Sequence, residues 1–168
     1  MGHHEHRAKG PECLTVGVLS ISTTRSLADD ASGHWIAQRA TREGHRVVAH
    51  EVVTDAVTAI RAALTRLLDD PNPQALILTG GTGITPKDVT FEAVRPLFAK
   101  ELTAFGPIFA QLSYEEIDSA ALLSRATAGV IGRSLVFCLP GSLKACQLAC
   151  KALIFPELGH MYGHIREA

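Results

Sequence analysis

The stretch LTGGTGITPKDVT, from Leu78 to Thr90, places three glycines, four threonines and one carboxylate directly after an apolar run that begins at Ala75. A short apolar run that ends in glycine is typical of a buried strand followed by a sharp turn. Glycines adopt positive φ angles and let a ligand approach the backbone, so successive N–H groups can bind an anion. The stretch therefore predicts a phosphate-binding turn, or else only a tight turn, at Gly80, Gly81, Thr82 and Gly83.

The composition limits the class of protein. With 168 residues, the chain has the length of one domain. Its 16 basic and 17 acidic side chains give a formal net charge of −1, which favours neither a nucleic-acid partner nor an anionic membrane. No apolar run approaches the roughly 18 residues of a membrane span, and the N-terminus lacks the apolar segment of a secretory signal. We expect a soluble, cytoplasmic protein.

The domain is expected to span residues 13–168, after a flexible, His-rich N-terminal tail at residues 1–12. His3, His4 and His6 could chelate a metal, but such tails are more often disordered. The cysteines match neither a zinc site nor a disulfide scaffold, so reduced thiols are expected. Cys146 and Cys150 share a helix face, which suits either a metal or redox pair or, as we favour, packing in the core.

The first half of the chain alternates strand and helix patterns. Strands are predicted at residues 14–20, 47–53 and 75–79. A helix at residues 31–43 ends at Gly44, and a second helix begins at a cap from Thr54 or Asp55 and ends before Pro71. This order predicts a three-layer α/β domain with a mainly parallel sheet and helices on both faces.

The second half begins with helical patterns at residues 91–98 and 105–117, followed by a short helical or irregular piece at 121–125. Strands at 127–131 and 135–139 are joined by a tight connection around Gly132, which predicts an antiparallel hairpin. A second turn then ends the strand and begins a long helix at 143–153. A final helical piece is expected to start at Pro156.

Ligands of parallel α/β sheets bind beyond the carboxyl ends of the strands. There the chain places Ser20 and Ser22 after the first strand, Asp55 after the second, and Asp88 just past the glycine turn. Each aspartate could be only a helix N-cap. Together, beside a phosphate-binding turn, they indicate a Mg²⁺ site, because Mg²⁺ is usually held by one or two carboxylates and by substrate phosphates.

Four motifs occur in an order that resembles the molybdenum cofactor biosynthesis proteins of the MoaB and MogA family. They are TGGTGITPKDVTFEAVRPLF, LSYEEI, LSRATAG and LPGSLKA, and the resemblance runs from about Leu14 to Leu158. It implies a molybdopterin-binding domain that adenylylates molybdopterin with Mg-ATP, releases pyrophosphate, and supplies a molybdenum-insertion protein. It also implies trimers, or hexamers built from them, for which Phe105, Ile108 and Phe109 are either interface or core residues.

The resemblance also implies roles for particular residues. The two essential aspartates of the family fall on Asp55 and Asp88, and its phosphate-binding turn falls on residues 80–83. A serine of the pterin side falls on Ser113 in LSYEEI. The second turn on the nucleotide side falls on Pro140, Gly141 and Ser142.

The sequence departs from the family pattern at three places. The loop SISTTRSLADDASG lacks the usual Ser-Asp-Arg start, so Ser22, Asp29 and Asp30 all remain candidates for ligand contact. Phe91 and Leu143 replace prolines that are usual in the family. Near the C-terminus, His160 and His164 are more consistent with the helix dipole than with a metal site.

Two alternatives to an adenylyltransferase stay open at this point. The chain could bind molybdopterin or nucleotide without turnover, or it could be a related module of another pathway, as in competence-damage-type proteins. The short chain carries no sign of a fused domain, which argues against the second alternative.

Overall fold

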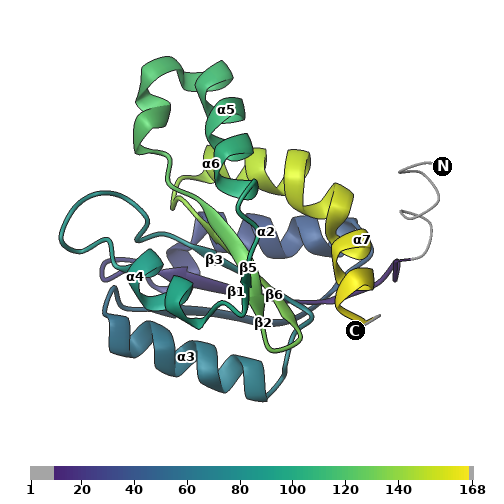
Figure 1. Ribbon diagram of the computed structural model, residues 1–168. Coiled ribbons are helices and arrows are strands. Elements are labelled where there is room, and N and C mark those ends of the chain that lie inside the picture. The colour runs from purple at the N-terminus through teal and green to yellow at the C-terminus, as the bar shows by residue number, and fades with distance from the viewer. Residues whose placement is uncertain (1–9, 167–168) are drawn as a thin grey trace.

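The computed structural model describes residues 10–166 (Figure 1). They form one six-stranded sheet with the strand order β2-β1-β3-β6-β5-β4. The strands are β1 Thr15–Ile21, β2 Arg46–Val53, β3 Ala75–Thr79, β4 Lys100–Glu101, β5 Thr127–Ile131 and β6 Ser134–Leu139. The expected tail histidines His3, His4 and His6 lie outside the described residues.

Five of the six strands run in one direction, and β5 runs in the opposite direction. β1 pairs with β2 and β3, and β3 pairs with β6, all in parallel, whereas β5 is antiparallel to both β6 and β4. The hairpin turns at Gly132 and Arg133, since Ile131 pairs with Ser134. This confirms the mainly parallel sheet with a short antiparallel part. The two-residue strand β4 was not predicted, because two exposed residues carry no periodic pattern.

Helices cover both faces of the sheet (Figure 1), which confirms the three-layer α/β architecture. One face carries α2 Ala31–Arg42, α5 Phe105–Ile117, α6 Leu143–Ala149 and α7 Phe155–Arg166, and the other carries α3 Val57–Asp69 and α4 Thr90–Val94. Short 3₁₀ turns at Leu27–Asp29, Arg95–Leu97 and Asp118–Leu123 connect the elements. Among the described residues, no helix is long and apolar enough to cross a membrane.

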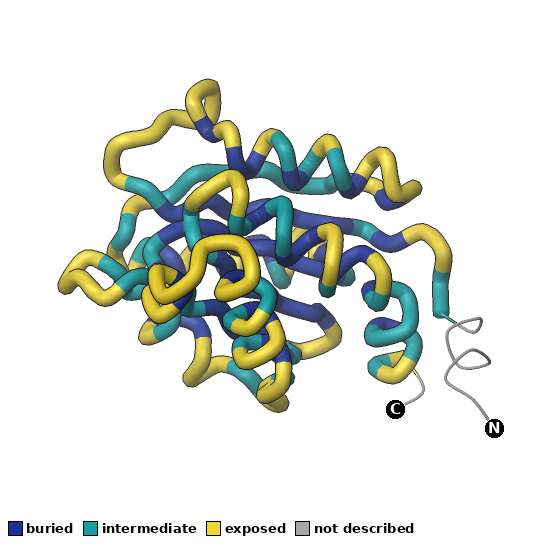
Figure 2. The backbone as a smooth tube through the Cα atoms, turned by 90° about the horizontal axis from the view of Figure 1, so that it is seen from above, coloured by how far each residue is buried: buried dark blue, intermediate teal, exposed yellow. Residues whose placement is uncertain are grey.

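The period-two alternation of the strands divides the core into two clusters. In β6, Leu135, Phe137 and Leu139 face the cluster under α2 and α6, whereas Val136 and Cys138 face the cluster above α3. The central strands are buried along their whole length, as Figure 2 shows by the dark blue tube at the centre of the molecule. Truncation of a fully buried ring such as that of Phe137 to alanine would cost about 3–5 kcal/mol.

The structure confirms two of the predicted helix ends and contradicts a third. Gly44 adopts a φ of 90° just beyond α2, and Ser142 caps α6 by accepting a hydrogen bond from the Ala145 N–H, as expected. The prediction that Thr54 or Asp55 caps α3 was wrong, because the N-cap is Ala56, without a side-chain bond. An extended residue between Asp55 and the helix leaves the carboxylate of Asp55 for other contacts.

The last two predicted helices form one continuous run. A π-helical turn at Cys150–Ile154 joins α6 to α7, and the Phe155 N–H donates to the carbonyl of Cys150, five residues earlier. The separate piece that we expected to start at Pro156 is therefore the continuation of the same helix. The wider turn lies directly before Pro156, the residue that lacks an N–H donor.

Cysteines contribute to the core rather than to a ligand site. Cys138, Cys146 and Cys150 are buried, Cys13 is exposed, and all four are free thiols. Burial raises the pKa of Cys146 to about 11, so the thiol stays protonated at neutral pH. Phe105 and Phe109 likewise belong to the core, whereas Ile108 of the same helix is 46% exposed.

Candidate functional site

A pocket of about 400 Å³ lies at the carboxyl ends of the parallel strands. Its wall is formed by the segments that follow β1, β2, β3 and β6, as expected for a parallel α/β sheet. The lining residues are Ile21, Ser22, Thr23, Thr24, Arg25, Asp55, Gly80, Gly81, Thr82, Gly83, Asp88, Leu123, Pro140 and Gly141. The structure thus brings together fourteen lining residues from segments that are far apart in the sequence, and we call this pocket the glycine-turn pocket.

The glycine turn itself is held by its neighbours. Gly80 and Gly81 adopt φ angles of 99° and 62°. The Gly80 N–H donates to the carbonyl of Leu139, 3.0 Å away, and the Thr90 hydroxyl and N–H donate to the carbonyls of Gly80 and Gly81. Within residues 10–166, the N–H groups of Gly81 and Thr82 form no hydrogen bond. The turn therefore retains backbone donors that a phosphate could use.

No side chain beyond hydrogen fits at these glycines. A Cβ atom at Gly80 would lie 2.4 Å from the carbonyl oxygen of Ile21, and one at Gly81 would lie 2.5 Å from the Thr90 hydroxyl. Gly141 of the second turn packs directly on Gly80, because a Cβ there would lie 3.2 Å from the Gly80 Cα. The two turns consequently form one continuous backbone surface.

Asp55 reaches this pocket from the end of β2. Its Oδ2 lies 3.5 Å from the Thr23 hydroxyl, and its Oδ1 is buried without a hydrogen-bond partner among the described residues. A buried carboxylate oxygen without a partner is costly unless a cation or donor completes its surroundings. Asp55 therefore fits a position that a metal ion or ligand would occupy.

Asp88 reaches the same pocket from the loop after the glycine turn. Its Oδ2 accepts hydrogen bonds from the Thr85 N–H at 2.9 Å and the Thr85 hydroxyl at 2.7 Å. These bonds hold the pKa of Asp88 below its ordinary value, with smaller contributions from the Gly83 backbone and Arg125. The N-cap of α4 is Val89, so Asp88 is not a helix cap. It is an ionised carboxylate in a fixed orientation.

Two carboxylates are the whole acidic set of the pocket. No group of three or more His, Cys, Asp or Glu side chains in the described part of the chain could hold a metal by itself. The lining also contains a single cationic side chain, Arg25. Such a set suits Mg²⁺ that arrives with a phosphate ligand, since Mg²⁺ usually keeps water and substrate oxygens in its shell.

The first loop is anchored by a buried polar cluster. Ser20 donates to Asp30 at 2.5 Å, His50 lies 2.8 Å from the same oxygen, and the Gly33 N–H donates to the other oxygen at 3.0 Å. Burial alone would raise the pKa of Asp30, but these hydrogen bonds outweigh burial and lower it. Asp30 is thus the N-cap of α2. Ser20 supports the loop from beneath and does not line the pocket.

Of the three candidates for ligand contact in this loop, Ser22, Asp29 and Asp30, only Ser22 faces the pocket. Ser22 lines it and accepts hydrogen bonds from the N–H groups of Thr24 and Arg25. Asp29 accepts instead from the Ser26 hydroxyl, and neither it nor Asp30 is a lining residue. Arg25 was not predicted as a site residue, although the arginine lies within the loop whose ligand contacts the sequence left open.

The second turn is fixed from below. The Pro140 carbonyl accepts from the Thr79 hydroxyl at 3.1 Å and from the Cys146 thiol at 3.4 Å, and the Gly141 carbonyl accepts from Ser32 at 3.0 Å. Pro140 and Gly141 line the pocket, whereas Ser142 caps α6 and lies outside the lining. Pro140 and Gly141 therefore lie in the pocket as expected, whereas the Ser142 side chain accepts a hydrogen bond from the Ala145 N–H.

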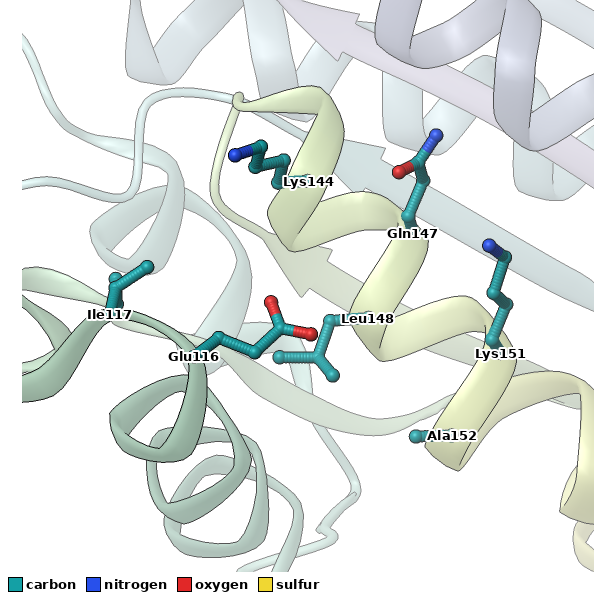
Figure 3. Close-up of a pocket in the computed structure, with 7 residues that line it drawn as sticks. All are labelled: Glu116, Ile117, Lys144, Gln147, Leu148, Lys151 and Ala152. Carbon is teal, nitrogen blue, oxygen red and sulfur yellow. The ribbon is translucent and has the colours of Figure 1, made fainter.

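Ser113 is not brought to this pocket. It is buried on α5, on the side of the sheet that α5 and α6 cover. A second hollow of about 480 Å³ lies between the end of α5 and α6 (Figure 3), lined by Glu116, Ile117, Lys144, Gln147, Leu148, Lys151 and Ala152. Although larger, it contains none of the predicted site residues, so the glycine-turn pocket is the candidate site.

Comparison with known proteins agrees with this architecture. Residues 17–160 match the family described as "Probable molybdopterin binding domain". Molybdenum cofactor biosynthesis protein B of Bacillus subtilis is 44% identical over 168 residues, which cover 99% of each chain. The protein of the same name from Escherichia coli is 41% identical over 85% of this chain and 84% of its own.

Solved structures show the same relationship. A crystal structure of a molybdenum cofactor biosynthesis protein B superposes with a TM-score of 0.90 at 40% identity, covering 94% of this chain and 99% of the other. The tungsten cofactor synthesizing protein MoaB from Pyrococcus furiosus superposes with a TM-score of 0.85 at 35% identity, covering 93% and 99%. The chain belongs to the molybdopterin-binding domain family. Its resemblance to MoaB proteins of cofactor biosynthesis is thereby confirmed.

Proposed function

We propose that this protein acts in molybdenum cofactor biosynthesis as a molybdopterin adenylyltransferase. The observation that carries the proposal is that Asp55 and Asp88 enter one pocket beside a glycine turn with unused N–H donors. Family membership supplies the substrate class, molybdopterin. ATP and Mg²⁺ follow from the chemistry of the pocket, since backbone donors and two carboxylates suit a metal-bound nucleotide.

The reaction joins two anions. An oxygen of the terminal phosphate of molybdopterin attacks the α-phosphorus of ATP, the bond to the β-phosphate breaks, and pyrophosphate leaves with the bonding electrons. No side-chain nucleophile is needed. The task of the protein is to hold both phosphates in line and to stabilise the charge of the transition state.

Each part of the pocket has a role in this scheme. The N–H groups of Gly81 and Thr82 would donate to phosphate oxygens, and the turn at Pro140 and Gly141 would bound the nucleotide. Arg25 would screen the repulsion between the two anions. Asp55 and Asp88 would hold Mg²⁺, which when bound supplies Lewis-acid stabilisation of phosphate oxygens.

The competing function is binding of molybdopterin or nucleotide without turnover. The decisive experiment incubates the purified protein with molybdopterin and Mg-ATP and follows adenylyl-molybdopterin and pyrophosphate by chromatography. Formation of both products in equal amounts, dependent on Mg²⁺, supports the enzyme. Tight molybdopterin binding without either product would replace the enzyme by the binding protein.

The proposal includes the surroundings of the reaction. We place it in the cytoplasm, with a molybdenum-insertion protein that consumes the product, and in a homotrimer or a hexamer built from trimers. Ile117 at the end of α5 is exposed, as are Leu122 and Leu123 in the 3₁₀ turn Asp118–Leu123, and Leu122 is 87% exposed. An apolar group of this kind supports association of subunits. Sedimentation of the purified protein measures its oligomeric state.

A further inference from the structure

Arg125 contacts the glycine turn from outside the pocket. It lies between the 3₁₀ turn Asp118–Leu123 and β5, and it is not a lining residue. Its Nη1 donates to the carbonyl of Gly83 at 2.9 Å, and its Nη2 donates to Glu92 at 3.3 Å. The guanidinium carbon lies 4.3 Å from the ring centroid of Phe91. The side chain thus has three partners, all on the loop and helix that follow β3.

Gly83 connects this arginine to Asp88. The Gly83 backbone also hydrogen-bonds Asp88, and a Cβ atom at Gly83 would lie 2.7 Å from the Asp88 Oδ2. Gly83 therefore links the two side chains, because its carbonyl accepts from Arg125 and its N–H donates to Asp88.

The loop of residues 84–87 has few packing contacts. Residues 84–87 are exposed, and the Ile84 side chain is 70% exposed. Packing therefore cannot fix the loop, and its orientation depends on hydrogen bonds. Those bonds come from Thr85 within the loop and from Arg125 outside it.

We propose that Arg125, supported by the ring of Phe91, is a positioning residue that holds Gly83 and Asp88 in the geometry required for phosphate transfer. This inference rests on the proposed function for its kinetic consequence only. Arg125 does not line the pocket, and its two terminal nitrogens donate to the Gly83 carbonyl and to Glu92. It acts on the site through the Gly83 peptide and through its charge near Asp88.

The chemistry of arginine explains the residue type. A planar guanidinium donates in two directions while one face stacks on an aromatic ring, whereas a lysine ammonium is a point charge on a flexible stem. Phe91 stands where proline is usual in the resembling family, and a proline offers no aromatic face. The departure at Phe91 is therefore the platform for Arg125.

The test compares Arg125→Lys, Arg125→Gln and Phe91→Leu with wild type. Arg61→Lys is the matched control, because Arg61 also donates to two carbonyls near α4, those of Glu92 and Ala93, but does not contact the glycine turn. Steady-state kinetics give kcat and KM for Mg-ATP. Side-chain carboxyl NMR gives the pKa of Asp88, and amide exchange reports on residues 82–85.

Both Arg125 variants should lower kcat by about 10-fold or more, because small displacements of catalytic groups have effects of that size. KM for Mg-ATP should change by less than about 3-fold, and amide exchange at residues 82–85 should accelerate. In Arg125→Gln, which removes the charge, the Asp88 pKa should also rise toward its ordinary value. Phe91→Leu should give a smaller loss, and combining it with Arg125→Lys should add little, since both remove one interaction. Arg61→Lys should change none of these quantities.

Two results would overturn the inference. If Arg125→Gln raises KM with kcat unchanged and Arg125→Lys restores it, the arginine binds the nucleotide directly. If the variants lose only thermal stability, to the same degree as Arg61→Lys, the residue is structural. The NMR and exchange measurements need no turnover, so an inactive wild-type protein would end the proposed function while the positioning role is still decided.

Discussion

Thr90 ties the glycine turn to the first turn of α4, because its hydroxyl donates to the carbonyl of Gly80 at 2.8 Å while its side chain is fully buried. Its N–H donates to the carbonyl of Gly81 at 2.9 Å. One residue therefore binds both glycines of the turn that adopt positive φ. The conformation of the glycine turn thus depends on a buried side chain that does not line the pocket.

Replacement Thr90→Val removes the hydroxyl and keeps the shape. It should lower the free energy of unfolding by about 1–2 kcal/mol, because the Gly80 carbonyl loses a buried donor. ATP affinity, measured by calorimetry, should fall at least about 3-fold as the turn loosens. Thr41→Val is the control, since Thr41 makes a similar bond to Ala37 at 3.1 Å on the exposed face of α2. Equal effects of both replacements on ATP affinity would contradict the prediction.

Gly81 can be compared with a glycine that has the same backbone conformation and free space. Gly81 has a φ of 62° and Gly132 a φ of 58°, but a Cβ at Gly132 has no neighbour within 4 Å. Alanine at either position should cost about 1 kcal/mol of backbone strain. Only Gly81→Ala should also abolish measurable ATP binding, because its methyl group meets the Thr90 hydroxyl. Normal ATP binding by Gly81→Ala would remove the phosphate-binding role of the turn.

The variants Asp55→Asn and Asp88→Asn should differ in their free energy of unfolding but should lower the rate of adenylyl transfer alike. Asp55→Asn removes the charge from a buried oxygen that has no partner, so the protein should be as stable as wild type or more stable. Asp88→Asn weakens two bonds from Thr85 and should cost up to about 1 kcal/mol. Each should lower adenylyl transfer by about 10²-fold, near 3 kcal/mol. Wild-type rates for both variants across a Mg²⁺ titration would refute the mechanism.

His45 predicts a loss of stability in mild acid. Burial lowers the pKa of His45 below its ordinary value of 6.5, and its Nδ1 accepts a hydrogen bond from the Leu14 N–H. The folded protein thus favours neutral imidazole. Its contribution to stability is complete above about pH 6.5 and declines as the pH falls through and below that value.

Thermal unfolding at pH 7.5, 6.5 and 5.5 tests this. The melting temperature should fall with pH, and His45→Gln, which keeps an acceptor but does not titrate, should reduce that dependence. An unchanged pH profile in His45→Gln would assign the effect to other groups.

Local patterns were enough to predict most elements of the fold. The run from Ala75 to Thr79 is β3 with the predicted bounds, and Phe105 to Ile117 is α5, because apolar periodicity reports directly which face is buried. The glycine turn and both aspartates were also predicted, since loops at the carboxyl ends of parallel strands must meet. These properties depend on residues close together in the sequence and on the general geometry of parallel sheets.

The sequence by itself determined the α/β fold, the glycine turn, and the position of Asp55 and Asp88 at the carboxyl ends of the strands. Tertiary structure alone decided that Ser20 supports Asp30 instead of a ligand, that Ser113 lies away from the pocket, and that Arg125 reaches Gly83 across 42 positions of sequence. The reason is that a strand or turn follows from neighbouring residues, whereas a side chain's partner depends on how distant segments pack. No periodic pattern encodes a bond between one arginine and one carbonyl.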